Sequence, residues 1–436
     1  MRLLERIRCV AVFGICGACA AGGAPSAGDD VEAAGRGCAF EIDAGVSEVV
    51  PTVGIVEWST TLETPTAAEI HFGLDEEYGA IAPVDLERPG MRTLLLGMKP
   101  ERTYHFRVQV TNATGTCHSG DHTLSTGSLS NELPELERAT FDAHEPTAGF
   151  LMSGFLLDGP AFILDADGDY VFAYGAGEMG RVRLNHAMTH LYYASVNVAG
   201  EGPSMKRVSL DGLVEEDLTA EFGALHHDFT VLPDETVAFI RHGELSDSVA
   251  EYRADGSVVE ILNLGHVFQD GEKTHANSLQ YAAFDDTYTL SDLAHDAFVK
   301  FDRNGSVIWI LGGEFSDFTG DGASWDGQHG HQLLGPERIV FFNNGPFQAD
   351  AATALEVALD LDSLTATRVW QYSPGETSRI YGDVQRLAMG NTLVTFSAAG
   401  LIQEVSSEGE LVEELSFELG SAIGYASKLP SLYVAR

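Results

Sequence analysis

Four short histidine segments recur in the second half of the chain, and each leads into an apolar, strand-like run. They are Asn185-His186, His226-His227-Asp228, His275-Ala276-Asn277-Ser278 and Gln328-His329-Gly330-His331. A neutral imidazole is a competent nucleophile, proton shuttle and metal ligand at physiological pH. If the strands that carry these segments are equivalent members of a repeated unit, the fold gathers distant histidines around one axis.

Two kinds of chemistry are open to such a cluster. In the first, one histidine attacks an electrophilic centre and forms a covalent intermediate while its neighbours stabilise the charge. In the second, three histidines hold a divalent metal ion with one open coordination position. Helical metal motifs such as H-E-x-x-H are missing from the sequence, and few carboxylates stand beside the histidines, Asp228 being the exception. Spacing does not separate the two, because the ligands would come from different repeats.

A turn of the Asp-Gly type recurs through the same half of the chain and predicts how the histidines are positioned. The turns are Asp167-Gly168, Asp211-Gly212, Asp255-Gly256, Asn304-Gly305, Asp362-Ser363 and Glu408-Gly409. Successive turns lie roughly 44, 44, 49, 58 and 46 residues apart, which is the period of a four-stranded propeller blade. Six turns predict six blades, each with one inner strand on a central channel. We expect the inner strands to begin near His186, His227, His275, His329 and Asp383.

The first part of the chain has a different pattern. Between residues 38 and 127, apolar residues alternate with polar ones in short runs such as 54–58 and 104–110, which predicts half-buried strands. The corner at residues 97–104 resembles that of a fibronectin type III-like β-sandwich, a kind of module to which we assign no chemistry. A polar connector over residues 128–145 separates this module from the propeller expected over residues 146–436. The predicted fold class is therefore all-β, a β-sandwich followed by a six-bladed propeller.

The composition narrows the class of partner. The chain has 436 residues, of which 44% are hydrophobic and 47 are Gly, as in a globular, turn-rich protein. Its 25 Lys and Arg against 65 Asp and Glu give a formal net charge of −40. Such a charge repels the phosphate backbone and argues against nucleic acid as a partner.

The N-terminus and the cysteines predict an exported protein. Residues 1–21 have the basic and apolar stretches of an export leader, and residues 22–37 form a linker. Cys19 is a candidate for lipidation, so we expect a periplasmic or cell-surface protein that contacts the membrane only through such an anchor. Cys38 and Cys117 are the two cysteines of the expected folded part. In an oxidising compartment such a pair favours a disulfide, the alternative being two unrelated buried thiols.

Several segments, in order along the chain, resemble those of bacterial arylsulfate sulfotransferases. They include His227-Asp228, residues 275–281, 289–292, 297–302 and 307–313, Gln328-His329-Gly330-His331, residues 340–345, 381–387 and 390–394. The resemblance covers about residues 146–436. It implies an exported six-bladed propeller without a cofactor. It also implies transfer of a sulfuryl group from an aryl sulfate ester to a small phenolic acceptor, independently of the nucleotide donor PAPS.

The resemblance also implies roles for individual residues. His329 matches the histidine that becomes transiently sulfated, and His227 and His275 match those that contact the sulfuryl oxygens or assist proton transfer. It implies no metal. The family places an arginine in the strand that follows His275, where this chain reads Ser291-Asp292-Leu293-Ala294-His295, so activity on standard aryl sulfates is expected to be weak. The candidates for a supporting role are His331, His295, Arg386 and Asn277.

Two other functions remain open from the sequence. A propeller that has lost the arginine is also suited to be a non-enzymatic binding or adhesion module. A metal-dependent hydrolase or lyase that uses the histidines is the second alternative. The sequence does not predict the natural donor, the acceptor or the oligomeric state.

Overall fold

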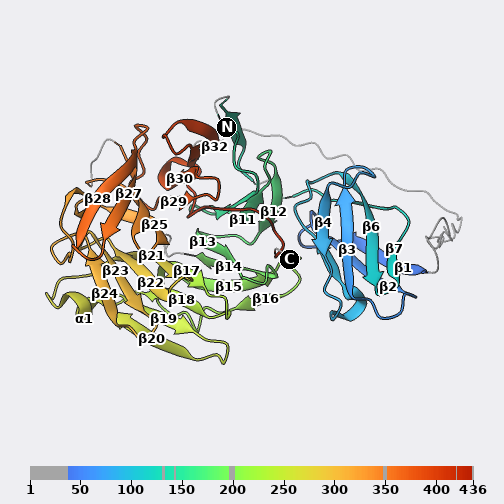
Figure 1. The fold of residues 1–436 in the computed structure, drawn as a ribbon, viewed down its shortest axis with the longest axis horizontal. Coiled ribbons are helices and arrows are strands. Elements are labelled where there is room, and N and C mark those ends of the chain that lie inside the picture. Colours follow the sequence, from blue (N-terminus) through green and yellow to red (C-terminus); the bar gives the residue numbers. More distant parts are fainter. Residues whose placement is uncertain are drawn as a thin grey trace, which may run out of the picture.

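The structure, a computed structural model, describes residues 38–129, 133–141, 144–195, 202–346, 351–418 and 420–434. The leader expected at residues 1–21, with Cys19, and the linker at residues 22–37 lie outside these ranges. Figure 1 shows a smaller β-sheet body, formed by the first described residues, beside a larger body in which sheets follow one another around a centre.

The smaller body contains two antiparallel sheets. One sheet has the order β1 (Phe40–Val46), β2 (Gly54–Thr60) and β5 (Thr93–Leu95). The other contains β4 (Ala80–Pro83), β3 (Ala67–Gly73), β6 (Thr103–Asn112), β7 (Gly115–His118) and β8 (His122–Ser125). Alternate residues of β6 are buried, as the period of two predicts. Its Tyr104 hydroxyl accepts a hydrogen bond from the Lys99 N–H at 2.8 Å, which fixes the corner that precedes the strand.

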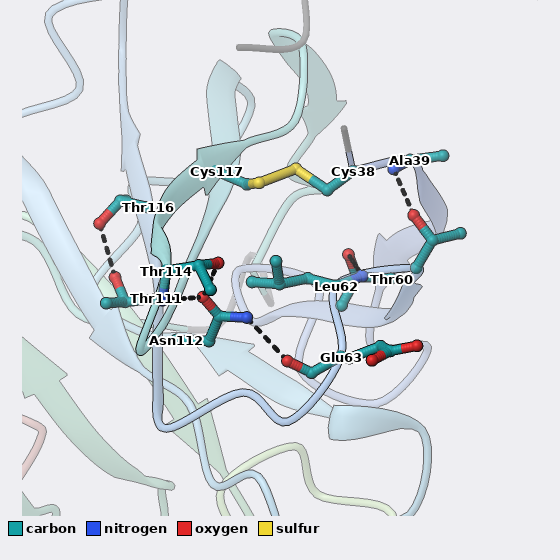
Figure 2. Close-up of a disulfide and its surroundings, with 11 residues drawn as sticks. Cys38, Ala39, Thr60, Leu62, Glu63, Thr111, Asn112, Thr114, Thr116 and Cys117 are labelled. Atoms are coloured by element: carbon teal, nitrogen blue, oxygen red, sulfur yellow. Dashed lines mark hydrogen bonds between the residues drawn. A yellow bond between two sulfur atoms is a disulfide. The ribbon is translucent and has the colours of Figure 1, made fainter. Parts of the chain in front are cut away.

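A disulfide closes the smaller body. Cys38 and Cys117 are bonded, with their Cα atoms 6.5 Å apart, so the predicted disulfide is confirmed. Figure 2 shows how it links the start of the described chain to β7. Close by, Asn112 donates to the Glu63 carbonyl at 2.8 Å, a second link across this end of the sandwich.

The larger body consists of five four-stranded sheets and one five-stranded sheet. The first contains β10 (Phe150–Gly154), β11 (Ala161–Leu164), β12 (Tyr170–Tyr174) and β33 (Ser427–Leu429), and the second β13 (Met179–Leu184), β14 (His190–Ser195), β15 (Ser204–Ser209) and β16 (Glu215–Asp217). The third contains β17 (Leu225–Val231), β18 (Val237–Arg241), β19 (Ser248–Tyr252) and β20 (Val258–Asn263), and the fourth β21 (Ala276–Ala282), β22 (Thr287–Asp292), β23 (Ala297–Asp302) and β24 (Val307–Leu311). The fifth contains β25 (Gln328–Gly335), β26 (Arg338–Asn343), β27 (Thr353–Asp360) and β28 (Thr365–Tyr372), and the sixth β29 (Asp383–Arg386), β30 (Thr392–Phe396), β31 (Leu401–Val405), β32 (Leu411–Phe417) and β9 (Leu136–Thr140).

Short helices connect a few strands of the two bodies. They are the α-helix α1 (Leu264–Phe268) and the 3-10 helices η1 (Pro89–Met91), η2 (Asp321–Ala323) and η3 (Ser397–Ala399). Within the described ranges, no helix has the length and apolar character needed to cross a membrane.

Each recurring turn of the sequence occupies the same place in its sheet. Asp167-Gly168 joins β11 to β12, Asn304-Gly305 joins β23 to β24, and the other turns likewise join the third and fourth strands of a sheet, counted from β33, β13, β17, β21, β25 and β29. The arrangement is propeller-like, because a buried apolar cluster fills the space between each pair of successive sheets. A further cluster joins the sixth sheet to the first and closes the ring.

Closure also uses strands from distant parts of the chain. β33 pairs with β10, so the first sheet contains residues from both ends of the larger body. Gln385 of β29 donates to the Lys428 carbonyl at 3.0 Å and accepts from its N–H at 2.7 Å. β9, which lies within the polar connector predicted over residues 128–145, pairs with β32. Part of that connector therefore belongs to the ring.

The two bodies share an interface. Val50, Val53 and Leu96 of the sandwich lie in the same buried cluster as residues of the first two sheets. Next to this cluster, Lys99 Nζ lies 2.6 Å from Asp167 and 2.6 Å from Asp169. The sandwich is therefore docked by both apolar and ionic contacts.

Candidate active site

The structure brings together the imidazoles of three inner segments at the centre of the ring. The ring centroids of His227 and His275 are 5.1 Å apart, and those of His227 and His329 are 6.2 Å apart. His226 lies 5.1 Å from His275, and His242 lies 5.0 Å from His226. We call these five residues the histidine cluster. Three of them were predicted from the sequence as site residues.

His186 does not join the histidine cluster, contrary to our expectation. β13 ends at Leu184, so His186 follows the inner strand of its sheet instead of beginning it. Its Nε2 donates to the Val231 carbonyl at 3.0 Å. The residue of this strand that lies at the centre of the ring is Arg181.

His329 is held in one tautomer by Asn344. His329 Nδ1 lies 2.6 Å from Asn344 Oδ1. The amide nitrogen of Asn344 donates to the carbonyls of Ser378 and Tyr381. Because that nitrogen is committed to two carbonyls, the amide oxygen faces His329 and Nδ1 carries the ring proton. Nε2 of His329 therefore keeps its lone pair.

Burial keeps these imidazoles uncharged. Burial lowers the pKa of His329 from 6.5 to about 4, although the hydrogen bond to Asn344 favours the protonated ring. Burial together with the neighbouring imidazoles lowers the pKa of His227 well below 6.5. Burial also lowers the pKa of His226 to about 4 and lowers that of His275. At neutral pH the site therefore offers free imidazole nitrogens instead of imidazolium charges.

Two residues of the site have strained backbones. His227 and Tyr381 have φ angles of 58° and 55°, a region that residues with a Cβ rarely occupy. The Tyr381 ring stacks on His227 with centroids 5.3 Å apart and lies 6.3 Å from the ring of His329. Such strain clusters at functional sites. Here it places an aromatic wall beside the two histidines.

Arg181 adjoins this site and was missed by the sequence analysis. Its guanidinium donates to both oxygens of Asp228 at 2.7 and 3.0 Å, and to Asp383 at 3.0 Å. It also lies 3.9 Å from the ring centroid of Tyr425. Arg181 is only 6% exposed, so two buried carboxylates already use its charge.

Gly330 allows β25 and β29 to touch beside His329. A Cβ at this position would lie 2.1 Å from Asp383 Oδ1. The Gly330 N–H donates to the Gly382 carbonyl at 2.9 Å. A residue with a side chain would push the two inner strands apart.

Two of the supporting candidates tie neighbouring inner strands together around His329. Asn277 donates to the Gln328 carbonyl at 2.7 Å. His331 Nδ1 lies 2.6 Å from Ser278 Oγ, and that hydroxyl also donates to the His329 carbonyl at 3.0 Å. Both contacts join β21 to β25, so they position His329.

The other two supporting candidates lie outside the histidine cluster. The His295 ring is hydrogen-bonded to the Asp292 carboxylate. Oδ1 of Asp292 also accepts a hydrogen bond from the backbone N–H of His275 at 2.6 Å. His295 therefore acts on the site only through Asp292. Arg386 forms an ion pair with Glu356, so its charge serves a structural contact and not the site.

Two groups of side chains that include residues of the histidine cluster could each bind a metal ion. One nitrogen each of His226, His227 and His275 lies within 4.8 Å of the other two. His226, His242 and Asp247 form a second group of the same size.

The histidine cluster lies within the part of the chain that matches a known protein family. The arylsulfotransferase (ASST) family matches residues 156–425, more than half of the chain, and the match includes the whole histidine cluster. The chain belongs to the arylsulfotransferase family. Membership supports aryl sulfotransferase activity in general. No curated protein matches this chain.

Solved structures share the architecture only loosely. Virginiamycin B lyase from Staphylococcus aureus is 11% identical with a TM-score of 0.42, and the match covers 68% of this chain and 99% of the lyase. A protein of unknown function from Bacteroides thetaiotaomicron is 12% identical with a TM-score of 0.38, covering 88% of this chain and 99% of that one. A putative 6-phosphogluconolactonase from Bacteroides fragilis is 12% identical with a TM-score of 0.40, and the match covers 65% of this chain and 100% of that one.

Proposed function

We propose that this protein moves a sulfuryl group from an aryl sulfate ester to a phenolic acceptor, independently of PAPS, through a sulfohistidine at His329. The observation that carries the proposal is the fixed tautomer of His329. Asn344 keeps the proton on Nδ1, and burial keeps the ring neutral, so Nε2 has a free lone pair at neutral pH.

In the first half-reaction, Nε2 of His329 attacks the sulfur of the donor. The N–S bond forms while the S–O bond to the aryl group breaks, and the phenolate leaves with the bonding electrons. The sulfated ring carries a positive charge that its Nδ1–H shares with the Asn344 oxygen, and a hydrogen bond from a charged donor is stronger than a neutral one.

In the second half-reaction, the oxygen of the phenolic acceptor attacks sulfur and the N–S bond breaks. His329 recovers its lone pair, and the acceptor oxygen loses a proton. His227 and His275 are uncharged bases next to His329, and we assign them this proton and contact with the sulfuryl oxygens. Tyr381 provides an aromatic surface on which a phenol ring can stack.

Among the residues that the structure describes, the site lacks an unpaired positive charge that could stabilise the sulfuryl oxygens. Arg181 is already paired with Asp228 and Asp383, so it does not replace the arginine that is missing from the strand that follows His275. Losing one preorganised charge partner costs about 3 to 4 kcal/mol, or about 10² to 10³ in rate. We therefore expect slow turnover of simple aryl sulfates by the protein alone.

Pre-steady-state kinetics test the proposal. Mixing the full chain with 4-nitrophenyl sulfate and no acceptor should release a burst of about one nitrophenolate per chain, because the covalent intermediate accumulates. Phenol should then restore turnover with ping-pong kinetics. His329→Ala should abolish the burst. His186→Ala, which removes an imidazole outside the histidine cluster, should keep it. A burst that survives in His329→Ala would refute the sulfohistidine.

We also propose that the protein acts outside the cytoplasm, in the periplasm or at the cell surface, on small phenolic molecules. The disulfide between Cys38 and Cys117 supports an oxidising compartment. Fractionation of cells that produce the full chain tests this location. Recovery of the mature protein in the cytoplasm with reduced cysteines would contradict it.

A further inference from the structure

We propose that His226, His227 and His275 bind a divalent transition-metal ion of the zinc type, which supplies the positive charge that the site lacks. The role of the ion in sulfuryl transfer rests on the proposed function, whereas its binding does not. In the metal-bound form the ligand nitrogens of His227 and His275 are occupied, so the ion would take over the contact with the sulfuryl oxygens and the acceptor proton would pass to solvent. The sequence predicts no cofactor, whereas the positions of these three side chains indicate a metal ion.

The three imidazoles are close enough to share one ion. Their ligand nitrogens lie within 4.8 Å of one another. A tetrahedral zinc ion with Zn–N bonds of about 2.0 to 2.1 Å needs nitrogens about 3.4 Å apart, so each must move by less than about 1 Å. Rotation of the rings about their side-chain bonds covers such a distance.

Two of the three rings have an unused nitrogen atom. Nδ1 of His226 and Nδ1 of His227 are buried without a hydrogen-bond partner. Buried polar atoms are nearly always paired in native proteins, so two such atoms in contacting rings indicate a missing partner. Nδ1 of each of these two rings is therefore free to bind a metal ion.

A buried carboxylate lies near the three imidazoles. Asp247 is fully buried, and its oxygens accept from His242 Nδ1 at 3.0 Å and from the Ala276 N–H at 2.8 Å. Asp247 forms no hydrogen bond with the three ligand rings, but its negative charge favours positive charge at His226 and His275. Asp247 and His242 also offer an alternative pair of ligands on the same side of His226.

Three protein ligands leave a zinc ion one open position, as in catalytic sites. The ring of His329 lies 6.2 Å from that of His227. A donor whose sulfur faces His329 would therefore place a sulfuryl oxygen near the ion. As a Lewis acid, the ion would then stabilise the charge on the transferring group. The net charge of −40 makes the protein as a whole attractive to cations.

Metal analysis of the full chain tests the inference. The protein is treated with a chelator, dialysed against Zn²⁺, and its zinc content and affinity are measured. We expect about one zinc ion per chain. His226→Ala, which removes a ligand that has no role in the proposed transfer, should weaken zinc binding by at least about 100-fold. His186→Ala should bind zinc like the wild type, and circular dichroism should show that both variants are folded.

Co²⁺ gives a second measurement that does not depend on activity. Bound by the three imidazoles, it should show visible absorption in the wild type that His226→Ala lacks. Failure of the wild-type protein to retain either ion, or equal retention by His226→Ala, would overturn the inference. If the ions bind as expected but His329 is never sulfated, the metal site stands and the proposed function fails. If His329 is sulfated equally fast with and without chelator and no ion is retained, the function stands and this inference fails.

Discussion

The side chain of Asn344 determines which ring nitrogen of His329 is the nucleophile. Asn344 follows β26 and faces back to His329, and its own orientation is fixed by the carbonyls of Ser378 and Tyr381. The reactivity of one histidine therefore depends on three successive segments of the chain. Asn344 is a positioning residue, because it acts on the substrate only through His329.

Asn344→Leu should lower kcat by about 10²-fold, the scale of losing one preorganised hydrogen bond at an active site. The KM for 4-nitrophenyl sulfate should change little, because the substrate does not contact Asn344. Steady-state kinetics measure both constants. Asn343→Leu is the matched control, since the Asn343 side chain donates to Thr353 and not to His329. Equal losses in the two variants would contradict the role of Asn344.

The neutral histidines make stability depend on pH. Burial lowers the pKa values of His329 and His331 from 6.5 to about 4 in the folded state. Between these values the unfolded chain binds more protons, so stability is complete above about pH 6.5 and is lost as the pH falls toward 4. At pH 5 each histidine should cost about 2 kcal/mol relative to pH 7.

Urea unfolding at pH 7 and pH 5 measures this loss. His331→Gln removes one of the two groups, so its difference between the two pH values should be smaller by about 2 kcal/mol. An unchanged difference would show that His331 is not held neutral by burial.

Individual residues were predictable where their type carried the signal. His227, His275 and His329 stand at the starts of inner strands, and spacing alone brings them together. Asn344 and Tyr381 carry no such signal, because asparagine and tyrosine are common and their roles appear only when three segments meet. Arg181 was missed for a related reason. His186 was predicted to begin an inner strand, although β13 ends before it.

At the level of elements, β33 closes the ring through a buried ion pair. Lys428 Nζ lies 2.6 Å from Glu404 and 3.3 Å from Glu413, which belong to β31 and β32. Without the ammonium group, two carboxylates would remain buried next to each other. Removing one partner of a buried pair is strongly destabilising for this reason.

Lys428→Met should therefore lower the free energy of unfolding by about 3 to 5 kcal/mol. Lys206→Met is the control, because Lys206 pairs with Glu215 at 2.9 Å at a position where both side chains are about one third exposed. That variant should lose less than about 1 kcal/mol. Denaturant unfolding compares the two, and similar losses would contradict the importance of the buried pair for ring closure.

Turn chemistry made the repeats predictable, since Asp-Gly and related turns join the third and fourth strands of each sheet. The closure of the ring was not predictable in the same way. β9 is only five residues long, and all but its first residue are exposed, so no apolar pattern marks it as a strand. It and β33 are strands because partners far away in the sequence leave an open edge for them.

At the scale of the whole molecule, chemistry and covalent stabilisation lie in different bodies. The disulfide is confined to the sandwich, whereas the histidine cluster lies wholly in the ring of sheets. The double variant Cys38→Ser and Cys117→Ser should reduce stability by about 4 kcal/mol, because the disulfide closes a loop of 79 residues.

This loss should appear in thermal unfolding, while the burst from 4-nitrophenyl sulfate at 25 °C should be unchanged. Loss of the burst in a folded double variant would show that the sandwich contributes to the site through the interface around Lys99 and Leu96. The two bodies are docked, so this result would have a structural route.

The central claim is that His329 carries the sulfuryl group between donor and acceptor. Mass spectrometry of the protein quenched after mixing with 4-nitrophenyl sulfate, without an acceptor, tests it most directly. We predict that the peptide containing residues 328–335 gains one sulfuryl group, that fragmentation places it on His329 and not on His331, and that phenol removes it. Release of nitrophenol with no sulfated His329, or with the group on another residue, would contradict the account.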